Sequence, residues 1–168
     1  MRKLSILAAA AAILTAAVWA GSAQAAHPHW VVDPYCTVNT STNVIDCSGK
    51  AAGLGSLPIF VVMNVNGGCQ NQDGTHVIPG RSRSVSGPFD TTNGSFAFGE
   101  ESTTGNFHRV SGTAPTCTGA SQISFVDSVT LSIYSCSSGQ PTFNSKGRQT
   151  NDSCTKLLGP TAADLTFV

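Results

Sequence analysis

The sequence predicts an all-β protein, a disulfide-stabilised antiparallel β-sandwich, with a barrel as the alternative. Beyond the first 25 residues, short apolar runs alternate with polar residues at the two-residue period of a strand, and no window keeps helical spacing over three turns. Turn signals such as Asn-Gly, Asp-Gly and Pro-Gly separate these runs. All six cysteines lie in the same region, and an even number fits an oxidised framework.

The strongest strand signal covers residues 57–65. One face of this strand would carry Leu57, Ile59, Val61, Met63 and Val65. The other face would carry Phe60 and Val62, so neither face suits water. We therefore expect this strand to be central and covered on both sides.

The remaining strands are predicted from shorter alternating runs. Residues 36–38 and 44–47 flank a polar tip at 39–43, which predicts a hairpin. Further strands are expected at 82–86, 94–99, 123–125, 129–134 and 165–168, the last of them closing the sheet at the C-terminal end.

Residues 1–25 have the three-part layout of a secretory signal peptide. A basic start at Arg2 and Lys3 precedes an uncharged apolar run, and small residues mark cleavage after Ala25 or Ala26. Residues 26–35 are expected to form a flexible N-terminal segment, and residues 36–168 a single β-sandwich domain. The protein is therefore expected to be secreted and to act outside the cell.

The six cysteines are expected to form three sequence-local disulfides. Composition alone allows fifteen pairings. The hairpin places Cys36 opposite Cys47, and a polar loop joins the end of strand 129–134 to Cys154, which favours a Cys136–Cys154 bridge. The two left over, Cys69 and Cys117, both fall in segments expected to be long loops. Each bridge is expected to contribute about 3–4 kcal/mol by restricting the unfolded chain.

The charge pattern excludes two classes of partner. Nine basic side chains balance nine acidic ones, so the formal net charge is zero. The densest basic pair, Arg81 and Arg83, is too small for a patch that would attract nucleic acid or anionic lipid. No second apolar run follows the signal-like segment, so no membrane span is expected.

Catalytic motifs are also missing from the sequence. There is no Gly-x-Ser-x-Gly elbow, and the Ser153–Lys156 stretch matches Ser-x-x-Lys without the helix that motif requires. The adjacent Glu100 and Glu101 would point to opposite faces of an extended chain. We therefore expect a non-enzyme that needs no cofactor, either an extracellular binding module or a cell-surface structural module.

The best candidate for a binding surface is the polar segment 66–83, expected to be a long loop held by Cys69. Its candidate contact residues are Asn71, Asp73, His76, Arg81 and Arg83. Loops on a rigid scaffold commonly carry recognition, and the ligand would be an extracellular protein or glycan. An alternative is a secreted protease inhibitor that exposes the same braced loop.

Two metal hypotheses follow from single features. The imidazoles of His27 and His29, with His76 or His108, are of a type that suits copper, and His27 would be N-terminal if the signal were cut after Ala26. The stretch around Asp73 resembles the start of a calcium loop, but Ser82 stands where an EF-hand needs Glu. A turn residue is therefore the expected role of Asp73.

One resemblance adds to this interpretation. The spacing Cys36…Cys47-Ser-Gly-Lys, then Gly53-Leu-Gly55, a strand, and Cys69-x-Asn71 leading to Pro79-Gly80 resembles a loose group of small secreted bacterial proteins. The resemblance covers about residues 36–133 and implies an immunoglobulin-like sandwich. It implies no catalytic residue, and the final 35 residues, with the Cys136–Cys154 loop, depart from that group.

Overall fold

The computed structural model describes residues 27–99, 108–119 and 121–168, and these residues form strands and no helix. The expected signal peptide and the pair Glu100–Glu101 lie outside the described residues. No helix in the described part is long and apolar enough to span a membrane. The strands are β1 (His29–Asn39), β2 (Val44–Ala52), β3 (Ile59–Asn71), β4 (Val77–Phe89), β5 (Phe96–Phe98), β6 (Val110–Thr113), β7 (Gln122–Cys136), β8 (Cys154–Ala162) and β9 (Asp164–Phe167).

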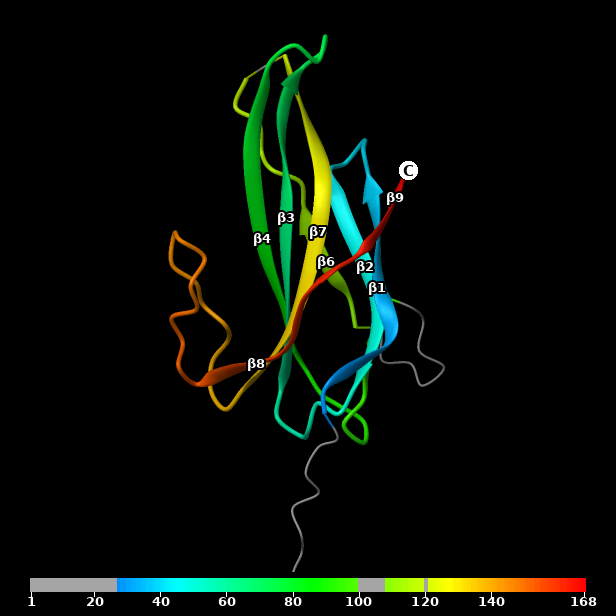
Figure 1. Ribbon diagram of the computed structural model, residues 1–168, viewed down its shortest axis with the longest axis vertical. Coiled ribbons are helices and arrows are strands. Elements are labelled where there is room, and N and C mark those ends of the chain that lie inside the picture. Colours follow the sequence, from blue (N-terminus) through cyan, green and yellow to red (C-terminus); the bar gives the residue numbers. More distant parts are fainter. Residues whose placement is uncertain (1–26, 100–107, 120) are drawn as a thin grey trace, which may run out of the picture.

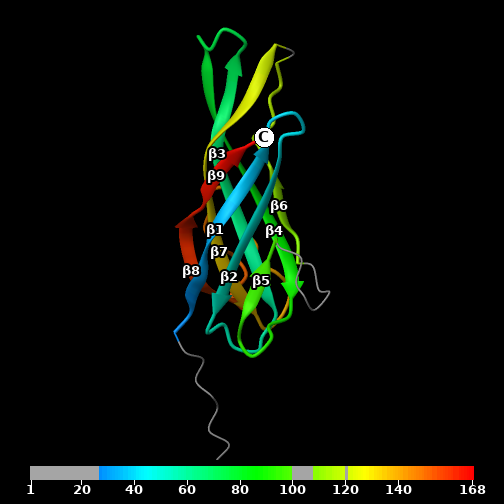
Figure 2. The ribbon, with the colours of Figure 1, turned by 90° about the vertical axis from the view of Figure 1, so that its right-hand side faces the viewer.

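The strands form two sheets that pack face to face as a β-sandwich (Figures 1 and 2). The first sheet has the order β5-β2-β1-β9, and β6 pairs with another part of β2. The second sheet has the order β4-β3-β7-β8. Its strands β3, β4 and β7 extend well beyond the first sheet at the top of Figure 1. The all-β sandwich expected from the sequence is therefore confirmed.

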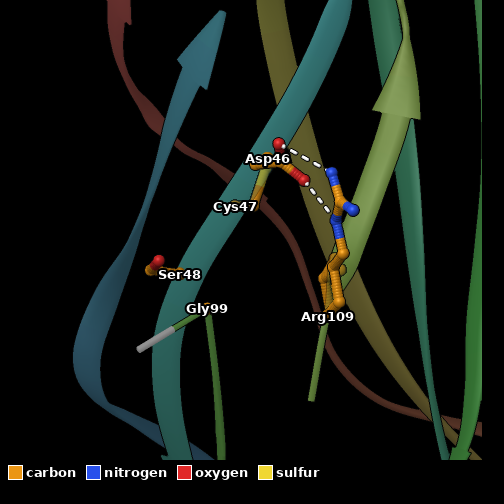
Figure 3. Close-up of a pocket in the computed structure, with 6 residues that line it drawn as sticks. Asp46, Cys47, Ser48, Gly99 and Arg109 are labelled. Carbon is orange, nitrogen blue, oxygen red and sulfur yellow. Dashed lines mark hydrogen bonds and ion pairs between the residues drawn. The ribbon is translucent and has the colours of Figure 1, made fainter. Parts of the chain in front are cut away.

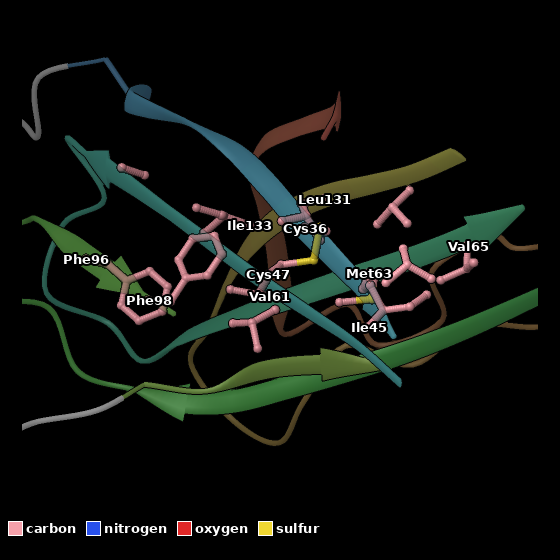
Figure 4. Close-up of a cluster of buried hydrophobic side chains, with 14 of the residues drawn as sticks. Cys36, Ile45, Cys47, Val61, Met63, Val65, Phe96, Phe98, Leu131 and Ile133 are labelled. Carbon is pink, nitrogen blue, oxygen red and sulfur yellow. A yellow bond between two sulfur atoms is a disulfide. The ribbon is translucent and has the colours of Figure 1, made fainter. Parts of the chain in front are cut away.

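The strand β3 is central and buried on both faces, as expected. Ile59, Val61, Met63 and Val65 point into the space between the sheets, each at most 1% exposed. They pack there against Leu131 and Ile133 of β7 and the aromatic rings of β5 (Figure 4). Leu57 was expected on this face, but it precedes the strand and is 48% exposed.

The other face of β3 is covered by the segment between β7 and β8. Phe60 and Val62 form a second buried cluster with Tyr134 and the Cys136–Cys154 disulfide. The ring of Phe143, from the covering segment, meets Tyr134 edge-on at 5.8 Å between centroids. This segment, the orange loop in Figure 1, replaces the third layer that an apolar outer face would otherwise need.

Both open sides of the sandwich are closed by contacts between the sheets. On one side the chain passes from β8 in the second sheet to β9 in the first through Ala163 alone. Near this crossing, Trp30 Nε1 donates a hydrogen bond to Thr161 Oγ1 at 2.9 Å. On the other side, Ser84 Oγ of β4 donates to the Ser111 carbonyl of β6 at 3.0 Å, and Ser82 makes a similar bond to Thr113.

The strand β9 closes the first sheet in an unexpected direction. It pairs with residues 35–38 of β1 in parallel, whereas all other strand pairs are antiparallel. The direct crossing from β8 explains this direction, because a chain that changes sheets without a hairpin continues along its course. Strand alternation in the sequence carries no signal for strand direction.

The disulfides are Cys36–Cys47, Cys69–Cys117 and Cys136–Cys154, the three pairs expected. The first and third join directly paired residues of neighbouring strands, with Cα–Cα distances of 4.0 and 4.1 Å. The placement of Cys69 in a loop was wrong, because it lies within β3 opposite Ile78. Its bridge ties the far end of β3 to the connection between β6 and β7.

The expectation of a flexible segment at 26–35 was wrong for most of its length. The strand β1 begins at His29 and pairs with β2 from His29↔Ala52 onward, with two shifts of register before Tyr35. Trp30 is half-buried and packs edge-on against Phe98, with 6.2 Å between ring centroids. Trp30, Val31, Val32 and Tyr35 are residue types that favour strands, and the burial of the Trp30 ring against the core stabilises this strand despite Pro34.

The burial of the second sheet's inner face predicts that two leucine-to-alanine substitutions lower the free energy of unfolding by very different amounts. Leu131→Ala removes a side chain that is 0% exposed, and we expect it to lower the free energy of unfolding by about 2–5 kcal/mol. Leu57→Ala is the same substitution at a 48% exposed position and is expected to cost less than about 0.5 kcal/mol. Urea unfolding of the oxidised proteins measures both, and equal losses would contradict the assigned inward face.

Candidate functional site

The outer face of the second sheet becomes polar where the covering segment ends. Asn64 and Asn66 alternate with the buried Met63 and Val65, so their side chains point outward. The strand register places polar residues on either side of them and produces two polar rows across three strands: Arg83, Asn64 and Thr130 in one, and Arg81, Asn66 and Ser128 in the other.

Hydrogen bonds hold the side chains of these rows in place. Arg83 Nε donates to Asn64 Oδ1 at 2.6 Å, and Asn66 Nδ2 donates to Ser128 Oγ at 3.2 Å. The guanidinium carbon of Arg83 also lies 4.3 Å from the centroid of the Phe143 ring, a cation–π contact. Arg83 is therefore held from two sides, and both Arg81 and Arg83 are exposed to solvent.

A tight turn of the covering segment forms one wall of the site. Asn144 Oδ1 accepts hydrogen bonds from the backbone N–H groups of Lys146 and Arg148, both at 3.0 Å. Gly147 has a positive φ of 79° and lies against the guanidinium of Arg83. This turn places the exposed Lys146 beside the polar rows.

The polar rows and the turn enclose a cavity of about 550 Å³. A second hollow of about 420 Å³ shares Asn66 and Arg81 with it and continues toward Gly80 and Asp127. We call the two together the outer groove. The larger cavity is lined by Asn64, Val65, Asn66, Arg81, Ser82, Arg83, Thr130, Asn144, Ser145, Lys146, Gly147 and Pro160.

The outer groove is locally basic in a protein of zero formal charge. Its larger cavity holds three cations, Arg81, Arg83 and Lys146, and no carboxylate, while Asp127 lies in the smaller hollow. Within the described residues, the ion pair that forms joins other groups, Arg109 and Asp46. The cations of the groove therefore remain available to an anionic ligand.

The positive charge of Arg83 also affects Tyr134, which lies on the same outer sheet face. Burial raises the pKa of Tyr134, and the positive charge of Arg83 opposes that rise. Tyr134 lies under the same Phe143 ring that packs on Arg83. The covered apolar cluster and the basic groove are thus neighbours on one sheet face.

The expectation of a long binding loop at 66–83 was wrong. Residues 66–71 belong to β3 and residues 77–83 to β4, and the two pair continuously from Asn66↔Arg81 to Gln70↔Val77. Only 72–76 connect them. The hairpin separates the five candidate contact residues, because Arg81 and Arg83 enter the outer groove while Asn71, Asp73 and His76 lie at the distant tip. The braced loop that a protease inhibitor would expose is therefore a paired hairpin.

At this tip Asp73 acts as a turn residue, as expected. Its Oδ1 accepts hydrogen bonds from the Thr75 backbone N–H at 3.0 Å and from Thr75 Oγ1 at 2.7 Å. The backbone bond, followed by the hydroxyl bond, lowers the pKa of the Asp73 carboxyl below its ordinary value. A carboxylate bonded in this way forms an Asx turn.

The described histidines do not come together in the way that the copper hypothesis requires. His29 Nδ1 lies 2.8 Å from the carbonyl oxygen of His27 at the start of β1. His76 is at the tip of the β3–β4 hairpin, and the His108 ring packs at 5.0 Å from Phe89 and 5.3 Å from Phe96. Within the described ranges, no three His, Cys, Asp or Glu side chains come close enough to hold a metal ion.

Another pocket, of about 330 Å³, lies on the first sheet between β2 and β6 (Figure 3). Its Arg109 donates from Nε to Asp46 Oδ1 at 2.9 Å and from Nη2 to Asp46 Oδ2 at 3.1 Å. These bonds raise the pKa of Arg109 and neutralise its charge locally. This pocket is therefore less suited to a charged ligand than the outer groove.

Several residues of the groove were missed from the sequence. The alternation of Asn64 and Asn66 with apolar residues in an otherwise apolar strand was a usable signal for an outward polar patch. Lys146 had no such signal, because only the folding of the stapled 137–153 segment brings it to β4.

Comparisons with family models, with curated proteins and with solved structures find no match. The resemblance to bacterial immunoglobulin-like proteins therefore stays a prediction.

The Asp73 turn predicts a pH effect at the hairpin tip. A carboxyl whose folded-state pKa is lowered stabilises the turn above its unfolded-state pKa, and that contribution is lost as the pH falls through the folded-state value. An NMR titration of the Asp73 carboxyl should give a midpoint below the ordinary 3.8. Thr75→Val removes only the hydroxyl donor and should move the midpoint part of the way back. A wild-type midpoint at or above 3.8 would contradict the Asx turn.

Proposed function

We propose that this protein is a secreted, non-catalytic binding module whose ligand-binding surface is the outer groove. One observation carries the proposal: Arg81, Arg83 and Lys146 converge on a cavity of about 550 Å³ that contains no carboxylate. Cations with no carboxylate beside them in the cavity favour a ligand that brings negative charge. The cavity volume is within the range that ligand sites occupy.

The strands under the groove and the disulfide beside it hold the groove in one conformation, which favours ligand binding. Its floor is β3, which is hydrogen-bonded on both edges and packed on the core through Met63 and Val65. Its wall is tied down by the Cys136–Cys154 disulfide and by the Asn144 turn. A site that is already ordered loses little conformational entropy when the ligand binds.

The framework also suits the expected location. Three disulfides join all six cysteines, and no free thiol is left. Disulfides persist in oxidising surroundings, which supports export and an extracellular site of action.

Titration with inorganic tripolyphosphate, followed by amide NMR, tests the site. We expect the largest shifts at residues 64–66, 81–83 and 144–147. The double variant Arg81→Gln/Lys146→Gln should weaken binding by about tenfold or more, because each cation supplies a charge-assisted contact.

The matched control is Lys50→Gln/Lys156→Gln, which removes the same charge from exposed side chains that do not line the groove. It should leave the affinity within roughly twofold at physiological salt, because salt screens exposed charges that make no direct contact with the ligand. Shifts centred on Asp46 and Arg109, or equal losses in both double variants, would reject the outer groove as the anion site.

A further inference from the structure

We propose that the ligand of the outer groove is an acidic polysaccharide, a sugar chain that carries carboxylate or sulfate groups. This inference rests on the proposed binding function and names the chemistry of its ligand. It follows from what the groove offers for hydrogen bonding, from its length, and from the position of its charges.

The backbone of the groove floor is not available to a ligand. The strand β3 pairs with β4 along one edge and with β7 along the other over residues 61–70. The groove lies on the face of this sheet, over β3 and both of its neighbours, β4 and β7. A peptide that binds by strand addition needs free backbone N–H and C=O groups, so that mode is closed along β3.

Side chains therefore supply the contacts, and most of them are amides or hydroxyls. Asn64, Asn66, Asn144, Ser145 and Thr130 all line the larger cavity. Amides and hydroxyls both donate and accept hydrogen bonds. A surface of this kind matches a ligand dense in hydroxyl groups, which do the same.

The groove is longer than a site for a single small anion. The two hollows, of about 550 and 420 Å³, join at Asn66 and Arg81. Each alone is within the size range of a small-molecule site. The cations gather in the first hollow, while the second contains Asp127, so the charge of the ligand should be spaced along a longer, hydroxylated chain.

An aromatic side chain continues this surface beyond the second hollow. Ser124 Oγ donates to Asn43 Oδ1, in the turn between β1 and β2, at 2.7 Å, so the next residue, Phe125, projects from the outer face. The Phe125 ring lies over Gly68, where an added Cβ would come within 3.1 Å of it. The half-buried ring offers an apolar surface to the C–H face of a sugar.

The test measures by isothermal titration how tightly four polymers bind to the oxidised protein without its expected signal peptide. Polygalacturonate and dextran sulfate represent the two anionic groups, dextran is the neutral chain, and poly-glutamate is the acidic peptide. We expect at least one acidic polysaccharide to bind about tenfold or more tightly than poly-glutamate, and dextran not to bind. Which of the two anionic chains binds more tightly identifies the anionic group.

Two variants separate sugar recognition from simple charge attraction. Asn66→Ala should weaken polysaccharide binding by about fivefold or more, because it removes an amide that bonds to the hydroxyl groups of the sugar. The same variant should leave tripolyphosphate binding within roughly twofold of the wild-type affinity. Arg81→Gln/Lys146→Gln should weaken both, with Lys50→Gln/Lys156→Gln as the control.

The outcomes distinguish the two proposals. If tripolyphosphate maps to the groove but poly-glutamate binds as tightly as the polysaccharides, the acidic-polysaccharide inference fails and the anion site stands. The inference also fails if Asn66→Ala leaves polysaccharide binding unchanged. If no anion perturbs the groove, both proposals fail.

Discussion

The burial of β3 on both faces is the constraint on which the other elements depend. Its inward residues, such as Met63, meet the first sheet, while Phe60 and Val62 need a separate cover on the outside. A shift of one residue in its pairing would exchange the two sets and bury Asn64 and Asn66. The register of the second sheet is therefore strongly determined, and the positions of β4 and β7 follow from it.

The same register creates the outer groove. It directs Asn64 and Asn66 outward and sets Arg83 and Arg81 beside them on β4. The stapled segment between β7 and β8 covers the apolar half of the outer face with Phe143 and borders the polar half with Lys146. One loop thus completes the packing of the sheet and forms a wall of the site, which couples the stability of this face to its binding surface.

The charge in the outer groove differs from the net charge of the whole protein. The formal net charge is zero, and the Arg109–Asp46 pair is neutral on the first sheet. Two of the three cations of the groove come from β4, and the third comes from a turn far from β4 in the sequence, so folding brings them together. A small cluster of this kind attracts an anion only at short range in physiological salt. Selectivity must therefore come from the amides and hydroxyls around it.

The sequence by itself determined the strands whose alternation is strong, the hairpin at 36–47 and the Cys36–Cys47 and Cys136–Cys154 bridges, because these depend on neighbours near in the chain. The Cys69–Cys117 pair followed only because these two cysteines were left over. The sequence was misleading at 66–83, where Gly67-Gly68 and Pro79-Gly80 indicate a loop. In the structure these two dipeptides pair with each other across β3 and β4. Glycine is needed at position 67 because an added Cβ would clash with the Phe125 carbonyl. Only the tertiary structure decided the parallel course of β9 and the meeting of Lys146 with Arg81 and Arg83. These depend on contacts between segments far apart in the chain, for which local propensity and spacing carry no signal.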